Sequence, residues 1–425
     1  MDSEGGKQPR TIAQGIILVT RQSSIQIGGL TVVERMVYAM ERAGVHTISL
    51  IAFDGPDAAI AMPRTRSRET RLRWCKVEYL PGAEKGNFLL FLRPVVIDSA
   101  AVQAVLELGV MPAPVIALNI ANQSGKTTAT GAYIIAGDAT NEIRRRVADA
   151  GGNPSGQAAA GEEAQAIVSA GVCCPIVSAD TGAEIRTAEN ALIGSMRKNT
   201  DGFLAYWLDR RISTAISRYL VRTPVTPNQI SLVTLVPALV GAVLIAASST
   251  LVSGAGALLF WLSTILDGCD GEVARLKYLE SPQGARLDLL CDGIGLIAVF
   301  VGVIMHVYWQ DSGPNLFYAG GAIIGGMVAA TVLEYLLITR RRIQHGGDPG
   351  ALSHEELKRR ELYERLASRD FAYLLPILAF TGTLIWFVWA TAVGVNLFWI
   401  ALVTIVVRKP MSRAPASTTP GPSCG

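Results

Sequence analysis

Residues 266–293 read LDGCDGEVARLKYLESPQGARLDLLCDG, and this stretch decides how the second half of the chain folds. It joins two long apolar runs and carries four aspartates, Asp267, Asp270, Asp288 and Asp292. Residues three or four positions apart are neighbours on one face of a helix, so each pair of aspartates would share a face. Two antiparallel helices joined by a short loop can therefore bring four carboxylates together.

The residues around these aspartates predict a site for a cation and a phosphorylated ligand. Four carboxylates at membrane depth would repel one another and lose their hydration unless a positive charge lay among them. Oxygen ligands suit Mg²⁺ or Mn²⁺, which commonly bridge carboxylates to substrate phosphates. The small residues Gly271 and Ala274 leave room for a nucleotide base or ribose. Arg275 and Arg286 can bind phosphate oxygens, and a remaining carboxylate could deprotonate an attacking hydroxyl.

The spacing of these residues resembles the complete motif of the CDP-alcohol phosphotransferase family. The eight fixed positions, spread over 26 residues, are Asp267, Asp270, Gly271, Ala274, Arg275, Gly284, Asp288 and Asp292. The VTPNQIS sequence, which contains Pro227 and Asn228, is also similar to the family. The resemblance covers roughly residues 200–410 and departs at Gly293, where many members carry a basic residue.

The resemblance implies a role for each matching residue. Asp267, Asp270 and Asp288 would bind two Mg²⁺ or Mn²⁺ ions, while Asp292 would be the catalytic base and a further metal ligand. The CDP-alcohol would be held by Asn228, Gly271, Ala274, Arg275 and Gly284. An acceptor hydroxyl would displace CMP at the β-phosphorus. The family also implies a homodimer. Apart from the resemblance, Arg286, Arg340 and Arg341 are candidate contacts of a phosphorylated acceptor, and the positive-inside rule is an alternative explanation for Arg340 and Arg341.

Six apolar runs after residue 225 predict an all-α membrane domain. They cover residues 227–248, 251–278, 284–309, 315–339, 370–392 and 394–408, judged against the roughly 20 residues that a helix needs to cross a bilayer. Basic residues cluster at alternate ends of successive runs, and the turns near residues 249, 311 and 394 contain none. The positive-inside rule therefore predicts a multi-pass protein of the cell (inner) membrane with both termini in the cytosol. Residues 200–223 predict an amphipathic helix in the membrane interface, or alternatively one packed on a soluble domain.

The first half of the chain predicts a cytosolic α/β domain. A β-α-β unit is expected over residues 14–53, with further strands at 88–92, 115–119 and 133–136 and helices at 99–108 and 141–148. This domain order is similar to that of family members with a nucleotidyltransferase-like domain. Such enzymes need a glycine-rich loop and a lysine after the first strand, and neither is found here, so we expect the domain to be inactive. The expected domains are residues 1–195, a linker with the interfacial helix at 196–224, the six-span domain at 225–410 and a flexible tail at 411–425.

Two other functions remain open from the sequence. In the first, the α/β domain makes the CDP-alcohol that the membrane domain consumes, as in bifunctional inositol-phosphate enzymes. In the second, the chain is a transporter, which would spread its acidic residues through the bilayer. The net charge of +3 gives no reason to expect nucleic-acid binding, so the expected partners are a CDP-alcohol, a hydroxyl acceptor and membrane lipids.

Overall fold

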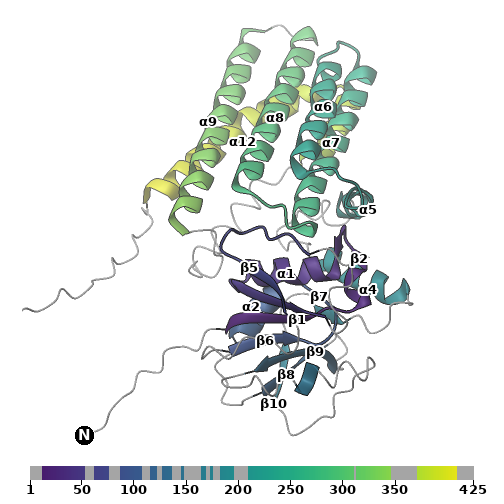
Figure 1. The fold of residues 1–425 in the computed structure, drawn as a ribbon. Coiled ribbons are helices and arrows are strands. Elements are labelled where there is room, and N and C mark those ends of the chain that lie inside the picture. The colour runs from purple at the N-terminus through teal and green to yellow at the C-terminus, as the bar shows by residue number, and fades with distance from the viewer. Residues whose placement is uncertain are drawn as a thin grey trace, which may run out of the picture. The chain divides into compact units, whose positions relative to one another are not determined.

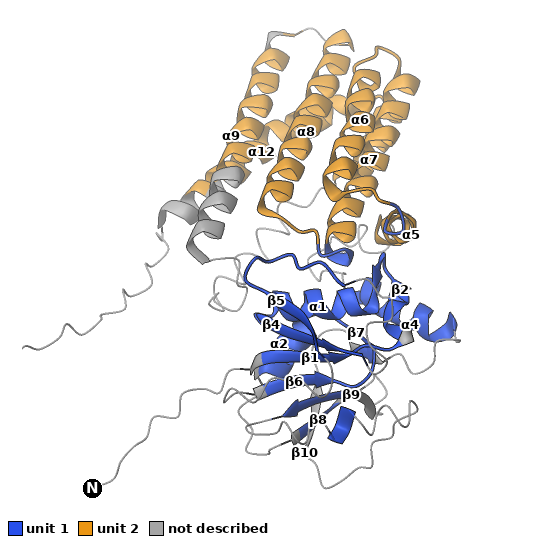
Figure 2. Cartoon of the chain, viewed as in Figure 1, with its two compact units in different colours: residues 1–197, 221–223, 275–278 blue, residues 198–220, 224–274, 279–425 orange. Residues whose placement is uncertain are grey.

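The computed structural model divides the chain into two compact units, shown separately coloured in Figure 2. It describes residues 12–52, 62–75, 87–107, 115–121, 127–135, 145–147, 164–168, 173–175, 182–195, 209–310, 313–345 and 371–408. Unit 1 comprises residues 1–197, 221–223 and 275–278, and unit 2 comprises residues 198–220, 224–274 and 279–425. The tail predicted at 411–425 lies outside the described residues.

Unit 1 contains a seven-stranded mixed sheet in the order β10-β8-β9-β6-β1-β4-β5 (Figure 1). Its strands are β1 (Ile12–Leu18), β4 (Thr47–Ile51), β5 (Arg71–Cys75), β6 (Asn87–Phe91), β8 (Val115–Ala121), β9 (Thr127–Ile135) and β10 (Ala164–Val168). β9 runs antiparallel to both of its neighbours, and the other pairings are parallel. Small two-stranded sheets pair β2 (Gln26–Ile27) with β3 (Leu30–Thr31) and β7 (Val95–Ile97) with β11 (Cys173–Pro175). The expected α/β architecture is confirmed for this unit.

The predicted β-α-β unit consists of β1, α1 (Val32–Arg42) and β4. Thr31 caps the start of α1, because its hydroxyl accepts from the Glu34 N–H while the Glu34 carboxylate accepts from the Thr31 N–H. Gly44, at a φ of 91°, follows the end of the helix. Helix α2 (Ser99–Glu107) agrees with prediction, while α4 (Gly182–Ser195) was missed. Of the helix predicted at residues 141–148, only residues 145–147 are described, and these are helical.

A buried arginine lies at the centre of the contacts between α1 and residues 275–278 within unit 1. Arg35 is 1% exposed and donates to the carbonyl oxygens of Ile27 at 2.8 Å and Leu276 at 3.0 Å. Its guanidinium also lies 5.8 Å from the centre of the Tyr278 ring. Burial raises the pKa of Tyr278, although the nearby Arg35 opposes this shift, and burial lowers the pKa of Lys277. Residues 275–278 are therefore an integral part of unit 1.

Unit 2 is helical, as predicted. Its helices are α5 (Arg210–Leu220), α6 (Pro227–Ile245), α7 (Thr250–Leu276, whose last two residues belong to unit 1), α8 (Pro282–Gln310), α9 (Pro314–His345), α11 (Phe371–Thr381) and α12 (Leu384–Arg408). Among the described residues, four segments are long and apolar enough to cross a membrane: α6, α7, α8 and residues 315–333 of α9. These four helices identify an integral membrane protein, while the predicted count of six spans is not confirmed.

The predicted boundary between the last two spans is wrong. The expected turn at Gly394 lies within α12, and the helix break falls instead at Gly382. Gly382 has a φ of 70°, a conformation that favours glycine, and its N–H donates to the Ala379 carbonyl while the Thr383 N–H donates to that of Leu378. Helix α11 therefore has 11 residues, or about 16 Å of length at 1.5 Å per residue. That is about half of the hydrocarbon thickness of a bilayer.

Glycines let the helices α6, α7 and α8 approach at backbone distance. A Cβ atom added to Gly256 of α7 would lie 2.6 Å from the Gly241 carbonyl oxygen of α6. One added to Gly302 of α8 would lie 2.4 Å from the Ala242 carbonyl oxygen of α6. Small residues commonly allow such contacts between membrane helices. The helices that carry the aspartate motif are thus tightly packed against α6.

Candidate active site

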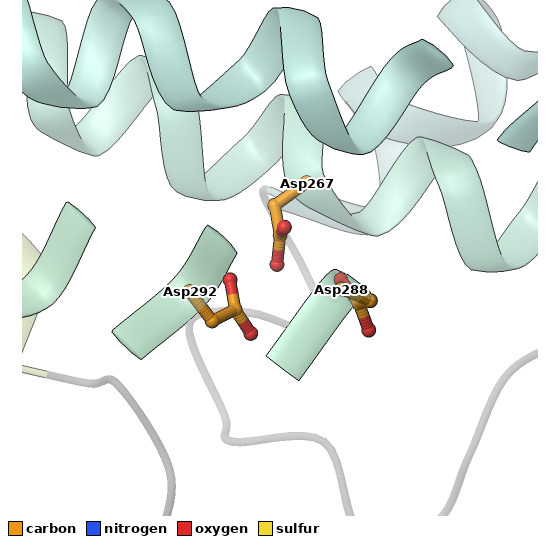
Figure 3. Close-up of side chains that lie close together, drawn as sticks. All are labelled: Asp267, Asp288 and Asp292. Carbon is orange, nitrogen blue, oxygen red and sulfur yellow. The ribbon is translucent and has the colours of Figure 1, made fainter. Parts of the chain in front are cut away.

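Three aspartates of the motif converge within unit 2. Asp267 lies on α7, and Asp288 and Asp292 lie one turn apart on α8. One carboxylate oxygen from each lies within 4.8 Å of the others, and all three residues are partly buried. Figure 3 shows the three carboxylates facing a common space between the two helices. The convergence expected from the helical spacing is therefore present for these three residues.

Asp270, the fourth aspartate of the motif, contacts Ser231 of α6 and is not part of this group of three. It is 7% exposed, and its carboxylate accepts a short hydrogen bond from the hydroxyl of Ser231 on α6. Its side chain also interacts with Asp288. Asp270 thus connects α6 to the acidic group, and its predicted role as a direct metal ligand stays a prediction. Ser231 is the last residue of the VTPNQIS sequence, but no role was assigned to it from the sequence.

The predicted nucleotide-binding residues fall at the neighbouring helix ends. Asn228 is exposed in the first turn of α6, and its Oδ1 atom would lie 3.0 Å from a Cβ atom added to Gly284 in the first turn of α8. The structure therefore brings these two residues together. Gly271 and Ala274 are half-buried on α7, four and seven residues beyond Asp267.

The predicted arginines differ in how far the structure describes them. Arg275 is half-buried in the last turn of α7, and Arg286 is half-buried in the first turns of α8. Arg340 and Arg341 lie on α9, but their side chains are outside the described part of the chain. The predicted acceptor contacts of Arg286, Arg340 and Arg341 accordingly stay predictions.

A small pocket between α6, α7 and α8 opens beside two of the aspartates. Its lining residues are Thr234, Leu235, Ala238, Phe260, Ser263, Thr264, Asp267, Cys291, Asp292, Gly295 and Leu296. The three hydroxyl groups donate to carbonyl oxygens of their own helices: Thr234 to Ser231, Ser263 to Phe260 and Thr264 to Trp261. Three hydroxyl groups and two carboxylates therefore line this pocket together with apolar side chains, and the two carboxylates can accept hydrogen bonds from a ligand.

The acidic group fits a hard divalent cation. Its donor atoms are carboxylate oxygens, which Mg²⁺ and Mn²⁺ prefer. Three carboxylates within 4.8 Å of one another repel strongly when ionised, and a cation would offset that repulsion. Asp267, Asp288 and Asp292 are the residues that could hold it.

Glu272, a further acidic residue of the motif region, faces away from the three aspartates. Glu272 of α7 is 1% exposed, and its Oε1 atom accepts from Arg210 Nη1 at 3.0 Å and from Ser213 Oγ at 2.8 Å, both on α5. Sequence reasoning missed this interaction because Glu272 is not one of the eight fixed positions of the motif and its partners lie about 60 residues earlier. An acidic residue within an apolar helix was the available signal.

Comparisons with known proteins include a family model that matches the helical part of the chain. A family model described as ceramide phosphoethanolamine synthase matches residues 204–326. The "Bifunctional IPC transferase and DIPP synthase" of Archaeoglobus fulgidus is 36% identical over 157 residues, which cover 37% of this chain and 30% of that protein. Its counterpart of the same name in Thermococcus kodakarensis is 44% identical over 115 residues, or 27% of this chain and 25% of that protein.

A shorter relative is covered more completely. The phosphatidylinositol phosphate synthase of Mycobacterium tuberculosis is 28% identical over 154 residues, which cover 36% of this chain and 69% of that protein. The chain spans only about a quarter to a third of the length of the two bifunctional relatives. With all eight motif positions filled and these matches in place, the helical part of this chain is similar to the CDP-alcohol phosphotransferase family.

Proposed function

We propose that this protein is a membrane-embedded phosphotransferase that moves a phosphoalcohol group from a CDP-alcohol to an acceptor hydroxyl and releases CMP. One observation carries the proposal: Asp267, Asp288 and Asp292, at their motif positions on two helices, present oxygens within 4.8 Å of one another. The names of the similar proteins, which are transferases and synthases, support the same class of reaction.

In this proposal the three carboxylates hold divalent cations, Mg²⁺ or Mn²⁺, with two ions as the expected number. A bound cation would neutralise the pyrophosphate and stabilise the charge on the departing CMP. Asp270 orients the acidic group by accepting from Ser231 and interacting with Asp288, and it is the proposed fourth ligand.

Asp292 is the proposed base. It lines the pocket between α6, α7 and α8, where an acceptor hydroxyl could donate to its carboxylate. As the acceptor oxygen bonds to the β-phosphorus, its proton passes to Asp292, and the bond from that phosphorus to the bridging oxygen of CMP breaks. The reaction needs no covalent bond to the protein.

The CDP group is assigned to the helix ends beside the acidic group. Asn228 and Gly284 are close neighbours there, and the small residues Gly271 and Ala274 leave space along α7. Arg275 is the proposed phosphate contact on the donor, and Arg286, Arg340 and Arg341 are the proposed contacts of the acceptor.

We further propose the cell (inner) membrane as the location, with both termini in the cytosol, and a homodimer as the assembly. The distribution of Lys and Arg supports this orientation. For unit 1 we propose an inactive nucleotidyltransferase-like domain, supported by its mostly parallel sheet and by the absence of a lysine from the sequence TRQSSIQIGG after β1.

A bifunctional enzyme is the second candidate, because two similar proteins carry the word bifunctional in their names. In that case unit 1 would make the CDP-alcohol from CTP and an alcohol phosphate. Full-length protein carrying Asp292→Asn separates the two candidates, since it should lose CMP release while keeping any CTP-dependent pyrophosphate release.

The proposed function is tested by CMP release from purified protein in detergent, with a panel of CDP-alcohols and acceptors, with and without Mg²⁺. We expect Mg²⁺-dependent release with at least one pair, and a loss of at least about 100-fold in kcat for Asp292→Asn. Equal turnover by Asp292→Asn and the parent protein would contradict the proposed base.

A further inference from the structure

We propose that Glu272 and Arg210 form a clamp that positions the metal-binding aspartates. The clamp fixes α5 against the side of α7 that lies opposite the three aspartates. The clamp comprises Glu272 of α7 with Arg210 and Ser213 of α5. This inference rests on the proposed metal site, and it assigns positioning roles to two charged residues outside the eight-position motif.

The clamp is buried. The Glu272 side chain is 1% exposed and that of Arg210 is 16% exposed, while their Oε1 and Nη1 atoms lie 3.0 Å apart. The second oxygen of Glu272 has no hydrogen-bond partner among the described residues. The carboxylate therefore depends on the Arg210 guanidinium and the Ser213 hydroxyl for its compensation.

The surrounding contacts show that the buried side of α5 is its small, polar side. Ser213 and Ser217 are the buried residues of this helix, and the thiol of Cys269 on α7 lies 3.6 Å from the Ser213 carbonyl oxygen. Arg218 and Tyr219 are exposed. Small side chains bury little apolar area, so the attachment of α5 to α7 rests on the clamp more than on hydrophobic packing.

A second contact holds the start of α5. Asp209, the residue before α5, accepts a short hydrogen bond from the hydroxyl of Tyr373 on α11. The Tyr373 ring in turn packs edge-on against Trp261 of α7, with ring centres 6.1 Å apart. The first turn of α5 is thus connected both to the motif helix and to α11.

Helical geometry explains why the clamp would act on the aspartates. At 100° per residue, Glu272 lies about 140° around the helix from Asp267 and about 160° from Asp270, using offsets of five and two residues. The clamp therefore holds α7 from the side opposite the acidic group. Residues that orient metal ligands typically change metal affinity about 10- to 100-fold when they are mutated.

The test measures Mn²⁺ binding to full-length protein in detergent by the electron paramagnetic resonance signal of free Mn²⁺. The variants are Arg210→Met, Glu272→Leu and the double variant. Arg218→Met is the matched control, because Arg218 is an exposed arginine on the same helix. We expect each single variant, Arg210→Met and Glu272→Leu, to raise the Mn²⁺ dissociation constant about 10-fold or more, and the double variant to raise it less. The control should stay within about twofold of the parent.

The double variant keeps the test informative if a single variant unfolds, because replacing both members of a buried pair by apolar residues is tolerated better than replacing one. Recovery of at least part of the Mn²⁺ affinity in the double variant would support the clamp. Folded single variants with parental Mn²⁺ affinity would overturn it, even if their thermal stability fell. A parent that binds Mn²⁺ but never releases CMP would instead contradict the proposed function and leave the clamp intact.

Discussion

Replacing Asp288 by asparagine should make the metal-free protein more stable while removing its response to Mn²⁺. The substitution keeps the shape of the side chain and removes one of three negative charges whose oxygens lie within 4.8 Å of one another. At 4.8 Å and an effective dielectric constant of about 20, Coulomb's law gives about 3.5 kcal/mol of repulsion for each ionised pair. Asp288 takes part in two such pairs.

Solvent screening reduces this repulsion energy, because all three aspartate side chains are only partly buried. We therefore expect Asp288→Asn to raise the free energy of unfolding of the metal-free protein by about 1–3 kcal/mol. In the parent protein, Mn²⁺ at 100 times its dissociation constant should add about 2.7 kcal/mol. The variant should show little or none of that second increase.

The assay is the midpoint of thermal unfolding in detergent, with a chelator and then with increasing Mn²⁺. Glu280→Gln is the matched control, since it removes an exposed acidic residue near α8 that lies outside the acidic group. That control should keep the full Mn²⁺ response. A metal-free Asp288→Asn protein that is less stable than the parent, or one that still gains stability from Mn²⁺, would refute the reasoning.

Three further predictions address packing, pH and the nucleotide site. Gly302→Ala should destabilise the protein by about 1–3 kcal/mol in thermal unfolding, because the added Cβ atom would lie 2.4 Å from a carbonyl oxygen of α6. Gly321→Ala is the control and should be neutral, because a Cβ atom added there would meet open space. Burial raises the pKa of Tyr278 in the folded state, so the unfolded chain loses the tyrosine proton at a lower pH than the folded protein does. The free energy of unfolding should therefore fall as the pH rises above 10.0. Tyr278→Phe should make this fall shallower in unfolding curves recorded between pH 9 and 11. Gly284→Ala should raise the KM for the CDP-alcohol about 10-fold with a smaller change in kcat, because the new methyl group would press on the Asn228 side chain at 3.0 Å, and an unchanged KM would argue against a nucleotide contact there.

The parts of the fold that local pattern determines could be predicted from the sequence. The apolar runs of α6 to α9 predicted four helices close to their observed bounds. The helical spacing predicted the convergence of four carboxylates, and three of them, Asp267, Asp288 and Asp292, lie together. The alternation of apolar and helical patterns likewise predicted β1, α1 and β4.

Features that depend on distant residues could not be predicted in this way. Gly382 and Gly394 both interrupt apolar sequence, yet only Gly382 ends a helix, and no local signal separates them. The strand β5 (RLRWC) carries charged residues and lies at the sheet edge, so it lacks the apolar run that marked the central strands. The partner of Glu272 became visible only when α5 and α7 were placed together.

The backbone contacts at Gly241, Gly256 and Gly302 have a consequence for how substrate choice could diversify in proteins of this design. Where main chains touch, no lipid tail can intercalate and no larger side chain can be accommodated without separating the helices. Gly241, Gly256 and Gly302 are therefore poor positions at which to introduce a new preference for the proposed acceptor. Variants with an altered preference should leave these three glycines unchanged.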